Sequence, residues 1–184
     1  MPDLGPIIDL SGCWDRCWEI AEERDGVHAR DGNYSKGRVQ IHFEGALGEV
    51  VLRWTVDPRL PLPEVLTTAD DGSDLARVVD VKAKVYMGPG LELQIPYRKE
   101  LVVPYYALAQ IDEARRRGRL VGFAKLREVR EAEIHEAGGR FRVRSRVIPA
   151  ASLRPLDELL RVLRAILYPQ LTALNDMLRN GGAR

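Results

Sequence analysis

The sequence predicts an α+β fold, a single domain over residues 1–184 with a mostly antiparallel sheet of about six strands. Two observations predict this class. Apolar residues recur with helical spacing near both ends of the chain, and segments of alternating apolar and polar residues, typical of half-buried strands, lie between them. An N-terminal helix, a middle helix and a long C-terminal helix are therefore expected to pack on the sheet.

Charge and hydropathy narrow the classes of function. Lysine and arginine number 28 and aspartate and glutamate 27, which gives a net charge of +1. This balance argues against a protein whose whole surface binds nucleic acid, although a local basic patch stays open. No apolar run approaches the roughly 18 residues that cross a bilayer, and the N-terminus lacks a secretory signal. We therefore expect a cytoplasmic protein with no membrane partner.

The N-terminal helix is expected over residues 12 to 24. Its apolar residues follow the spacing of one buried helical stripe, namely Leu10, Cys13, Trp14, Cys17, Trp18 and Ala21. The two cysteines share a helix face, so a metal site or a redox pair is conceivable. Since they belong to the stripe and the chain holds no other cysteine, two packed, reduced thiols are the preferred interpretation.

Several short strands are expected to follow. Residues 38–44 and 50–56 alternate apolar and polar side chains, and the glycines between them suggest a hairpin turn. Residues 57–75 contain three prolines and four aspartates, which predicts a long loop. Residues 76–87 and 91–95 then return as strands.

A middle helix is expected over residues 105–117, because Pro104 suits a first helical position and good helix formers follow it. Arg115, Arg116 and Arg117 would lie in its last turn, where cations favour the helix dipole. The same triplet is a candidate for phosphate contacts. A strand over 119–129 and a hairpin that turns at residues 136–139 come next. That turn would pair Glu133 with Arg142 and Glu131 with Arg144.

The C-terminal amphipathic helix is expected over residues 152–180, with a break near Pro169. It carries a continuous apolar stripe, made of Leu156, Leu159, Leu160, Leu163, Ile166 and Leu167. Covering the sheet is its expected role. A homodimer through this helix is the alternative, because the stripe is longer than one small sheet can bury.

The segment "VVDVKAK", residues 78–84, carries the one candidate catalytic motif. Asp80 and Lys82 are two residues apart on a predicted strand, so their side chains share a face. A strand with its polar edge in water accounts for the same pattern. Walker loops, dinucleotide-binding glycine motifs, HExxH motifs and nucleophile elbows are absent from the sequence.

With this motif on its third strand, the element order over roughly residues 12 to 127 resembles the PD-(D/E)XK nuclease superfamily. The resemblance implies that Asp57 and Asp80 hold Mg or Mn and that Lys82 activates water for phosphodiester hydrolysis in DNA or RNA. It also implies an auxiliary role for Gln110.

Three functions follow from these observations. In the absence of a strong catalytic constellation, we favour a non-enzymatic module that binds a protein partner or assembles with itself. The alternative is the metal-dependent nuclease, with nucleic acid as its partner. The second alternative is a pocket for a small apolar ligand between the sheet and the C-terminal helix, lined by Trp54, Tyr86, Tyr97, Tyr105 and Tyr106.

Overall fold

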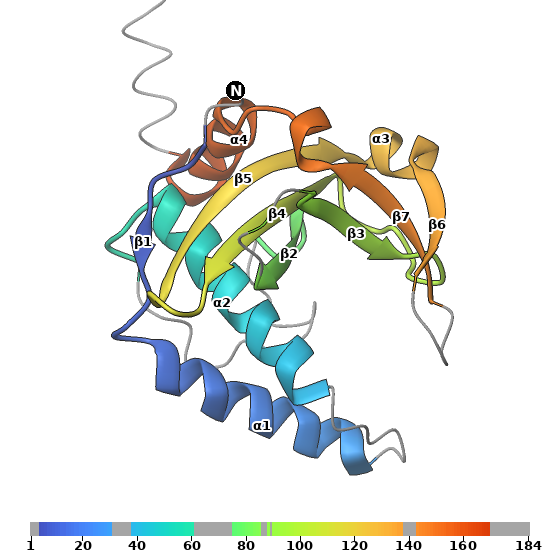
Figure 1. Cartoon of the computed structure of the whole chain (residues 1–184). Helices are drawn as coiled ribbons and strands as arrows, with labels where there is room; N and C mark the ends of the chain where they lie inside the picture. Colours follow the sequence, from blue (N-terminus) through green and yellow to red (C-terminus); the bar gives the residue numbers. More distant parts are fainter. Residues whose placement is uncertain are drawn as a thin grey trace, which may run out of the picture.

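A computed structural model of the protein describes residues 4–30, 38–60, 75–85, 88, 90–137 and 143–169 (Figure 1). Its strands form two sheets, a larger one in the order β1-β5-β4-β2 and a smaller one in the order β3-β7-β6. Among the ladders of these residues only that between β2 and β4 is parallel. The predicted α+β class with mostly antiparallel pairing is confirmed.

The larger sheet consists of β1 (Ile8–Asp9), β5 (Arg117–Lys125), β4 (Tyr105–Asp112) and β2 (Val79–Val85). The smaller sheet consists of β3 (Glu92–Pro96), β7 (Val143–Pro149) and β6 (Glu133–Ala137). The helices are α1 (Trp14–Arg30), α2 (Arg38–Val56), α3 (Leu126–Glu131) and α4 (Asp157–Leu167). A short 3-10 turn, η1 (Ala150–Ser152), precedes α4.

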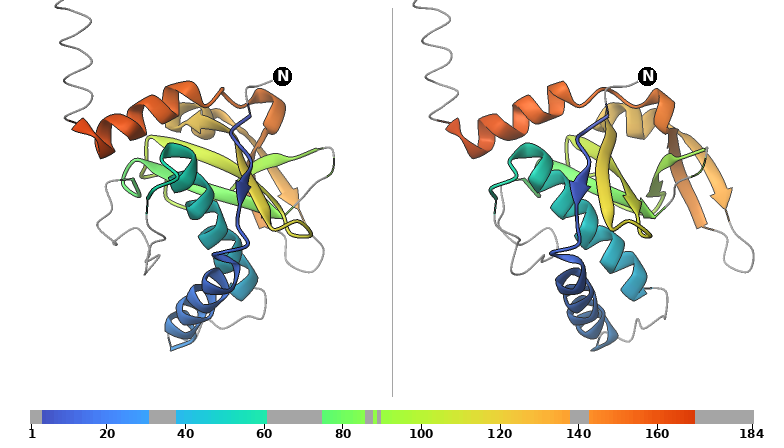
Figure 2. Two further views of the ribbon diagram at one scale, coloured as in Figure 1. Left: turned by 90° about the vertical axis from the view of Figure 1, so that its left-hand side faces the viewer. Right: turned by 60° about the vertical axis from the view of Figure 1, so that its left-hand side comes forward.

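Helix α2 covers one face of the larger sheet, and α1 packs across α2 on the side away from the sheet (Figures 1 and 2). Phe43 of α2 joins the two helices, because its ring stacks on Trp18 at 3.9 Å and meets Trp14 edge-on at 5.1 Å. Cys13 and Cys17 are buried and reduced within the same core. The prediction of packed cysteines in an N-terminal helix is confirmed.

The predicted hairpin over residues 38–56 is wrong, because this segment is the continuous helix α2. Its buried residues follow a helical stripe that runs through the two glycines, made of Phe43, Ala46, Leu47, Val50 and Val51. Gly48 is a packing residue, not a turn residue. A Cβ there would lie 3.0 Å from the Cβ of Ala83 on β2, so glycine permits the close contact between helix and sheet.

The predicted middle helix over residues 105–117 is also wrong. This segment is strand β4 followed by a turn, and β4 is buried on both faces. Tyr106 and Leu108 pack into one core cluster, while Ala107, Ala109 and Ile111 pack into the other. Only a strand sends successive side chains to opposite sides in this way, so tertiary packing overrides the helix propensity of the segment.

The smaller sheet packs on the other face of the larger one. Leu93 and Ile95 of β3 contact the cluster that contains Tyr106 and Leu108. The predicted register of the last hairpin is wrong, since Glu133 pairs with Val147 and Glu136 with Arg144. The reason is that Glu136 and Ala137, which were expected in the turn, belong to β6, so Glu133 pairs with residue 147 instead of residue 142. Glu131 lies in α3 and not in a strand.

Helix α4 packs its predicted stripe on the core, with Leu156, Leu159 and Leu163 buried. Tyr168, directly before Pro169, leaves the helical conformation with φ −131 and ψ 60. The part of the helix expected beyond Pro169 lies outside the described residues, and the dimer through it stays a prediction. None of the helices in the described ranges combines the length and hydropathy that crossing a membrane requires.

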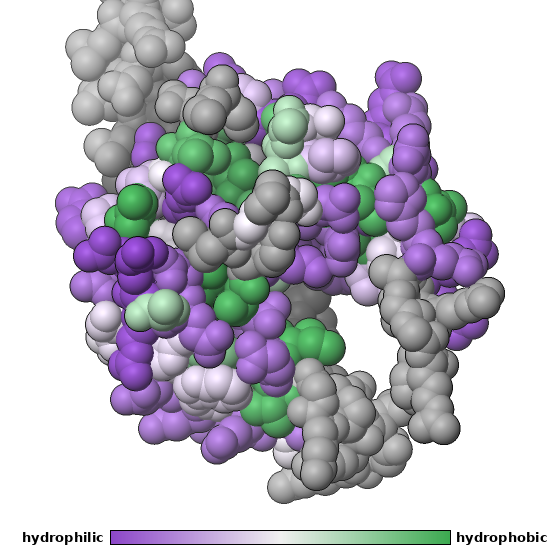
Figure 3. All heavy atoms as spheres, viewed as in Figure 1, coloured by the Kyte–Doolittle hydropathy of each residue, from purple (hydrophilic) through white to green (hydrophobic). Residues whose placement is uncertain are grey.

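Exposed hydrophobic residues are scattered. On the face seen in Figure 3, hydrophilic residues predominate and the hydrophobic ones form separate patches. The large apolar side chains with the most exposure come from different elements, among them Ile7, Ile41, Val102 and Ile134. Single exposed apolar residues are ordinary for a protein surface.

Candidate anion-binding site

Asp57 lies directly after α2 and has a structural role. Its carboxylate accepts hydrogen bonds from Arg59, at 3.0 Å from Nε and 2.7 Å from Nη2, and from the hydroxyl of Tyr168. These donors hold the pKa of Asp57 well below its usual range. Since Tyr168 follows α4, the carboxylate connects the ends of the two helices.

Asp80 and Lys82 are in contact, as their spacing on a strand predicts. The Lys82 Nζ lies 2.7 Å from Asp80 Oδ1, and the Nζ of Lys99 lies 2.5 Å from Asp80 Oδ2. Asp57 does not join them, because it sits at the end of α2 with partners of its own. In the described ranges no three His, Cys, Asp or Glu side chains gather as a metal site. The structure thus brings together one carboxylate and the lysine of the proposed nuclease motif.

Gln110 lies on the same sheet face as Lys82, further along. It pairs with Lys84 in the β2–β4 ladder and with Arg119 in the β4–β5 ladder. Its side-chain oxygen accepts two hydrogen bonds from Arg119, at 3.0 Å from Nε and 2.9 Å from Nη2. Gln110 is only 8% exposed, so this amide fixes the arginine against the sheet.

The side chains of Arg115, Arg116 and Arg117, at the β4–β5 turn, do not all lie in one place. Arg115 donates to the carboxylate of Asp112 at 2.9 Å. Arg116 has a left-handed backbone with φ 47, and its guanidinium lies over the ring of Trp14 at 5.6 Å. Arg117 opens β5. Of the three predicted phosphate contacts, Arg115 and Arg117 therefore share a site and Arg116 packs elsewhere.

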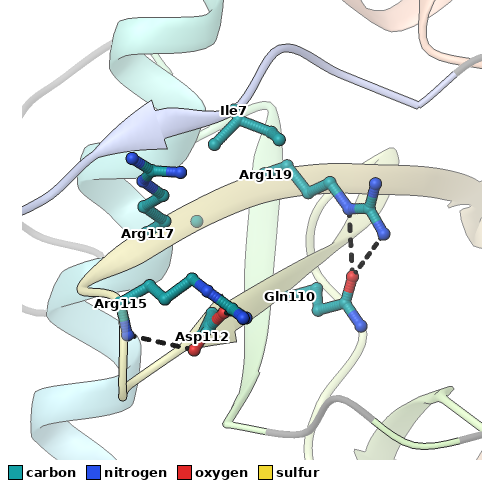
Figure 4. Close-up of a pocket in the computed structure, with 7 residues that line it drawn as sticks. Ile7, Gln110, Asp112, Arg115, Arg117 and Arg119 are labelled. Atoms are coloured by element: carbon teal, nitrogen blue, oxygen red, sulfur yellow. Dashed lines mark hydrogen bonds and ion pairs between the residues drawn. The ribbon is translucent and has the colours of Figure 1, made fainter.

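This site is a pocket of about 300 Å³ on the surface of the β4–β5 hairpin (Figure 4). Its lining is Ile7, Gln110, Asp112, Arg115, Arg117, Gly118 and Arg119. Gly118 allows β5 to lie close to α2, because a Cβ there would come within 2.5 Å of Val51 Cγ2. The two residues on either side of this glycine, Arg117 and Arg119, turn their side chains toward the opposite face of the sheet.

Charge in the pocket is unbalanced. Three arginines face one carboxylate, Asp112. Arg115 donates hydrogen bonds to that carboxylate, and these bonds hold the pKa of Asp112 below its ordinary value. Arg119 is bonded to a neutral amide, so its charge is not cancelled by its partner. The residues that line the pocket thus carry an excess of positive charge, which Asp9, opposite Arg117 in the β1–β5 ladder, partly offsets.

Of the five aromatic residues proposed to line an apolar pocket, the four in the described part of the chain lie in different surroundings, although Trp54 and Tyr105 pack against the same core cluster. Trp54 donates to the carbonyl of Leu60, Tyr105 packs edge-on against Phe123, and Tyr106 is fully buried. Tyr97 lies beside the smaller sheet, under the guanidinium groups of Arg144 and Arg146. Tyr86 lies outside the described residues. An apolar ligand pocket lined by these residues stays a prediction without structural support.

Sequence reasoning missed Arg119 and Lys99. A usable signal existed for Arg119, because Arg115, Arg117 and Arg119 alternate and would share one side of a strand and its turn. The expected helix over this segment obscured that alternation. Lys99 lies in the connection between β3 and β4, and nothing in the sequence links it to Asp80.

Comparison with protein-family models, with curated proteins and with solved structures finds no match for this chain.

Proposed function

We propose that this protein is a non-enzymatic binding module that takes a phosphate-bearing ligand in the pocket of the β4–β5 hairpin. The observation that carries the proposal is the cluster of Arg115, Arg117 and Arg119 around one hollow with a single carboxylate. Planar guanidinium groups match the oxygens of phosphate and can bind them through two hydrogen bonds each. A small basic pocket fits a chain whose overall charge is balanced.

The rigidity of the site supports the proposal. Arg117 and Arg119 stand on a strand that is paired with β4 along its length. Gln110 holds the guanidinium of Arg119 before any ligand arrives, so little side-chain freedom is lost on binding. The shared chemistry is the phosphate group, carried either by a small molecule or by a nucleic acid strand.

The experiment measures binding of two probes to the full chain at low salt. Adenosine monophosphate, followed by calorimetry, represents a small phosphorylated ligand. A fluorescein-labelled single-stranded 12-mer, followed by anisotropy, represents a nucleic acid. We expect Arg119→Ala to weaken whichever probe binds by about 10-fold or more, since a charge-assisted hydrogen bond contributes roughly 1.5–3 kcal/mol.

Two further variants make this test specific. Arg119→Lys keeps the charge and loses the planar fork, so an intermediate loss is expected. Arg127→Ala is the matched control, because Arg127 is exposed, lies on α3 and pairs with Glu131. Equal loss in both alanine variants, or no binding of either probe to the wild type at millimolar concentration, would overturn the proposal.

The metal-dependent nuclease stays the alternative function, supported by the contact between Asp80 and Lys82. It needs a second carboxylate beside Asp80, and Asp57 does not supply it in the described structure. Cleavage of labelled DNA or RNA with Mg²⁺ or Mn²⁺, present in the wild type and absent in Asp80→Ala, would establish it. Equal cleavage in both proteins, or none in either, would rule it out.

A further inference from the structure

A second pocket, of about 350 Å³, lies at the far end of β2, the edge strand of the larger sheet. We call it the edge pocket. Strand β2 contacts both α2 and β3, and all three regions contribute to the lining, with Glu44, Lys84, Val85, Leu91, Glu92 and Gln94. The edge pocket shares no lining residue with the pocket of the β4–β5 hairpin, which we call the anion pocket. It is therefore a separate candidate site.

The packing of α2 on β2 brings Glu44 to this pocket. Gly48 of α2 lies against Ala83 of β2, where an added Cβ would be 3.0 Å from the Cβ of that alanine. Glu44 is one helical turn before Gly48, and residues one turn apart share a helix face. Val85 is two residues beyond Ala83 and packs against the same core cluster. The helix face that packs on β2 therefore carries the Glu44 carboxylate to the end of the strand, beside Val85.

The charged groups of the edge pocket are hydrogen-bonded to neutral amides. Gln40 Nε2 donates to Glu44 Oε1 at 3.2 Å, and Gln94 Nε2 donates to Glu92 Oε2 at 3.1 Å. The Nζ of Lys84 donates to Gln94 Oε1 at 2.8 Å. Within the residues that the structure describes, none of these two carboxylates and one ammonium forms an ion pair. Their charges are thus held in place by the amides without being neutralised.

Burial strengthens the attraction of these groups for a charged ligand. Glu44, Lys84 and Glu92 are each half-buried, and charges that are partly buried are screened less by salt and water than exposed ones. The edge pocket presents two negative groups and one positive group, which gives a net charge of −1. Its ionic complement is a small molecule with two cationic groups and one anionic group.

We propose that the edge pocket binds a free basic amino acid of the lysine type. The ligand's carboxylate pairs with Lys84, and its two ammonium groups pair with Glu44 and Glu92. Val85 and Leu91 supply apolar surface for the methylene chain between those groups. The volume of the pocket lies at the small end of the range for ligand sites, which suits a single amino acid. The inference does not rest on the anion pocket, because the residues and the charge of the ligand differ.

The experiment is calorimetry of the full chain with L-lysine and with analogues that each lack one of its charges. Norleucine lacks the side-chain ammonium, 6-aminohexanoate lacks the α-ammonium, and cadaverine lacks the carboxylate. We expect each analogue to bind about 10-fold or more weakly than lysine, because each leaves one charged group of the pocket unpaired. If any analogue binds as tightly as lysine, or if lysine does not bind the wild type at millimolar concentration, the proposal is overturned.

Four variants locate the ligand. Glu44→Gln keeps the shape of the side chain and should weaken lysine binding about 10-fold or more, whereas Lys84→Met should make lysine and cadaverine bind alike. Glu19→Gln is the matched control, because Glu19 is exposed on α1 and pairs with Arg16, and it should leave lysine binding unchanged. Arg119→Ala should also leave it unchanged. Loss of lysine binding in Arg119→Ala but not in Glu44→Gln would place the ligand in the anion pocket and overturn the proposal.

Discussion

The two faces of the larger sheet differ in how completely they are covered. Toward α2 the strands present mostly apolar side chains, among them Val79, Ala107, Ala109, Ile111 and Leu120. On the opposite face the smaller sheet covers Tyr106 and Leu108, and polar residues follow further along the same strands. On this face Asp80 and Lys82 of β2 lie directly beside Tyr106 and Leu108, and Gln110 follows further along β4. One face holds the fold together, and the other carries both the anion pocket and the contact between Asp80 and Lys82.

The covered face should be the more sensitive to truncation. Phe43→Ala removes a ring that is fully buried between two tryptophans, and we expect a loss of about 3–5 kcal/mol in the free energy of unfolding. Ile41→Ala is the matched control on the same helix, because Ile41 is 68% exposed, and should cost less than about 0.5 kcal/mol. Urea denaturation measures both. A strand at this position would make the two substitutions equally costly.

The ion cluster of Asp80, Lys82 and Lys99 on the partly covered face should make the free energy of unfolding depend on pH. Between pH 8 and about 10.5 the unfolded chain holds a proton on Lys82 that the folded protein has released. The free energy of unfolding should therefore rise with pH over this window, by on the order of 2 kcal/mol. Lys82→Met should lack the rise. Denaturation midpoints at several pH values test this, and parallel curves for the two proteins would contradict it.

The smallest effect on the free energy of unfolding is expected from a substitution of Tyr106. Its ring is fully buried, but its hydroxyl forms no hydrogen bond of good geometry within the described part of the chain, although the backbone of Val103 lies nearby. Tyr106→Phe keeps the ring and removes a buried polar group, so stability should change by less than about 1 kcal/mol and can rise. A loss of several kcal/mol would show that the hydroxyl has a partner in the native protein.

An element that packs against one core could be predicted from the sequence, whereas an element that packs against two cores could not. The stripes of α1 and α4 and the alternation of β2 each face one core, and their patterns identified them. Strand β4 packs against two cores, so apolar residues occupy both of its faces. Its sequence therefore lacks the alternation of apolar and polar residues that marks a half-buried strand, and it resembles a helix. In α2 the stripe that includes Phe43 was hidden by Gly45 and Gly48, which resemble turn residues in sequence. Only Gly48 has a packing role, because β2 lies directly against it.

The contacts in the candidate sites could likewise be predicted only where a single strand brings the residues together. Asp80 and Lys82 share a face through their spacing alone, and the contact follows from the strand. The placement of Arg119 beside Gln110 requires knowing that β4 and β5 form a hairpin, which the expected helix excluded. Lys99 reaches Asp80 only through the fold of the chain between β3 and β4, and no local pattern encodes such a contact.

The order of strands along the chain has a consequence for how the protein is made. Strand β2 pairs with β4, yet β3 lies between them in sequence and belongs to the other sheet. Leu93 of β3 pairs with Ile148 of β7, near the end of the described chain. During synthesis β3 therefore emerges long before its partner, and such long-range pairing forms slowly. Neither sheet can be excised as an independent fragment, and a chain that stops before β7 leaves the edge of β3 open to pairing with another molecule.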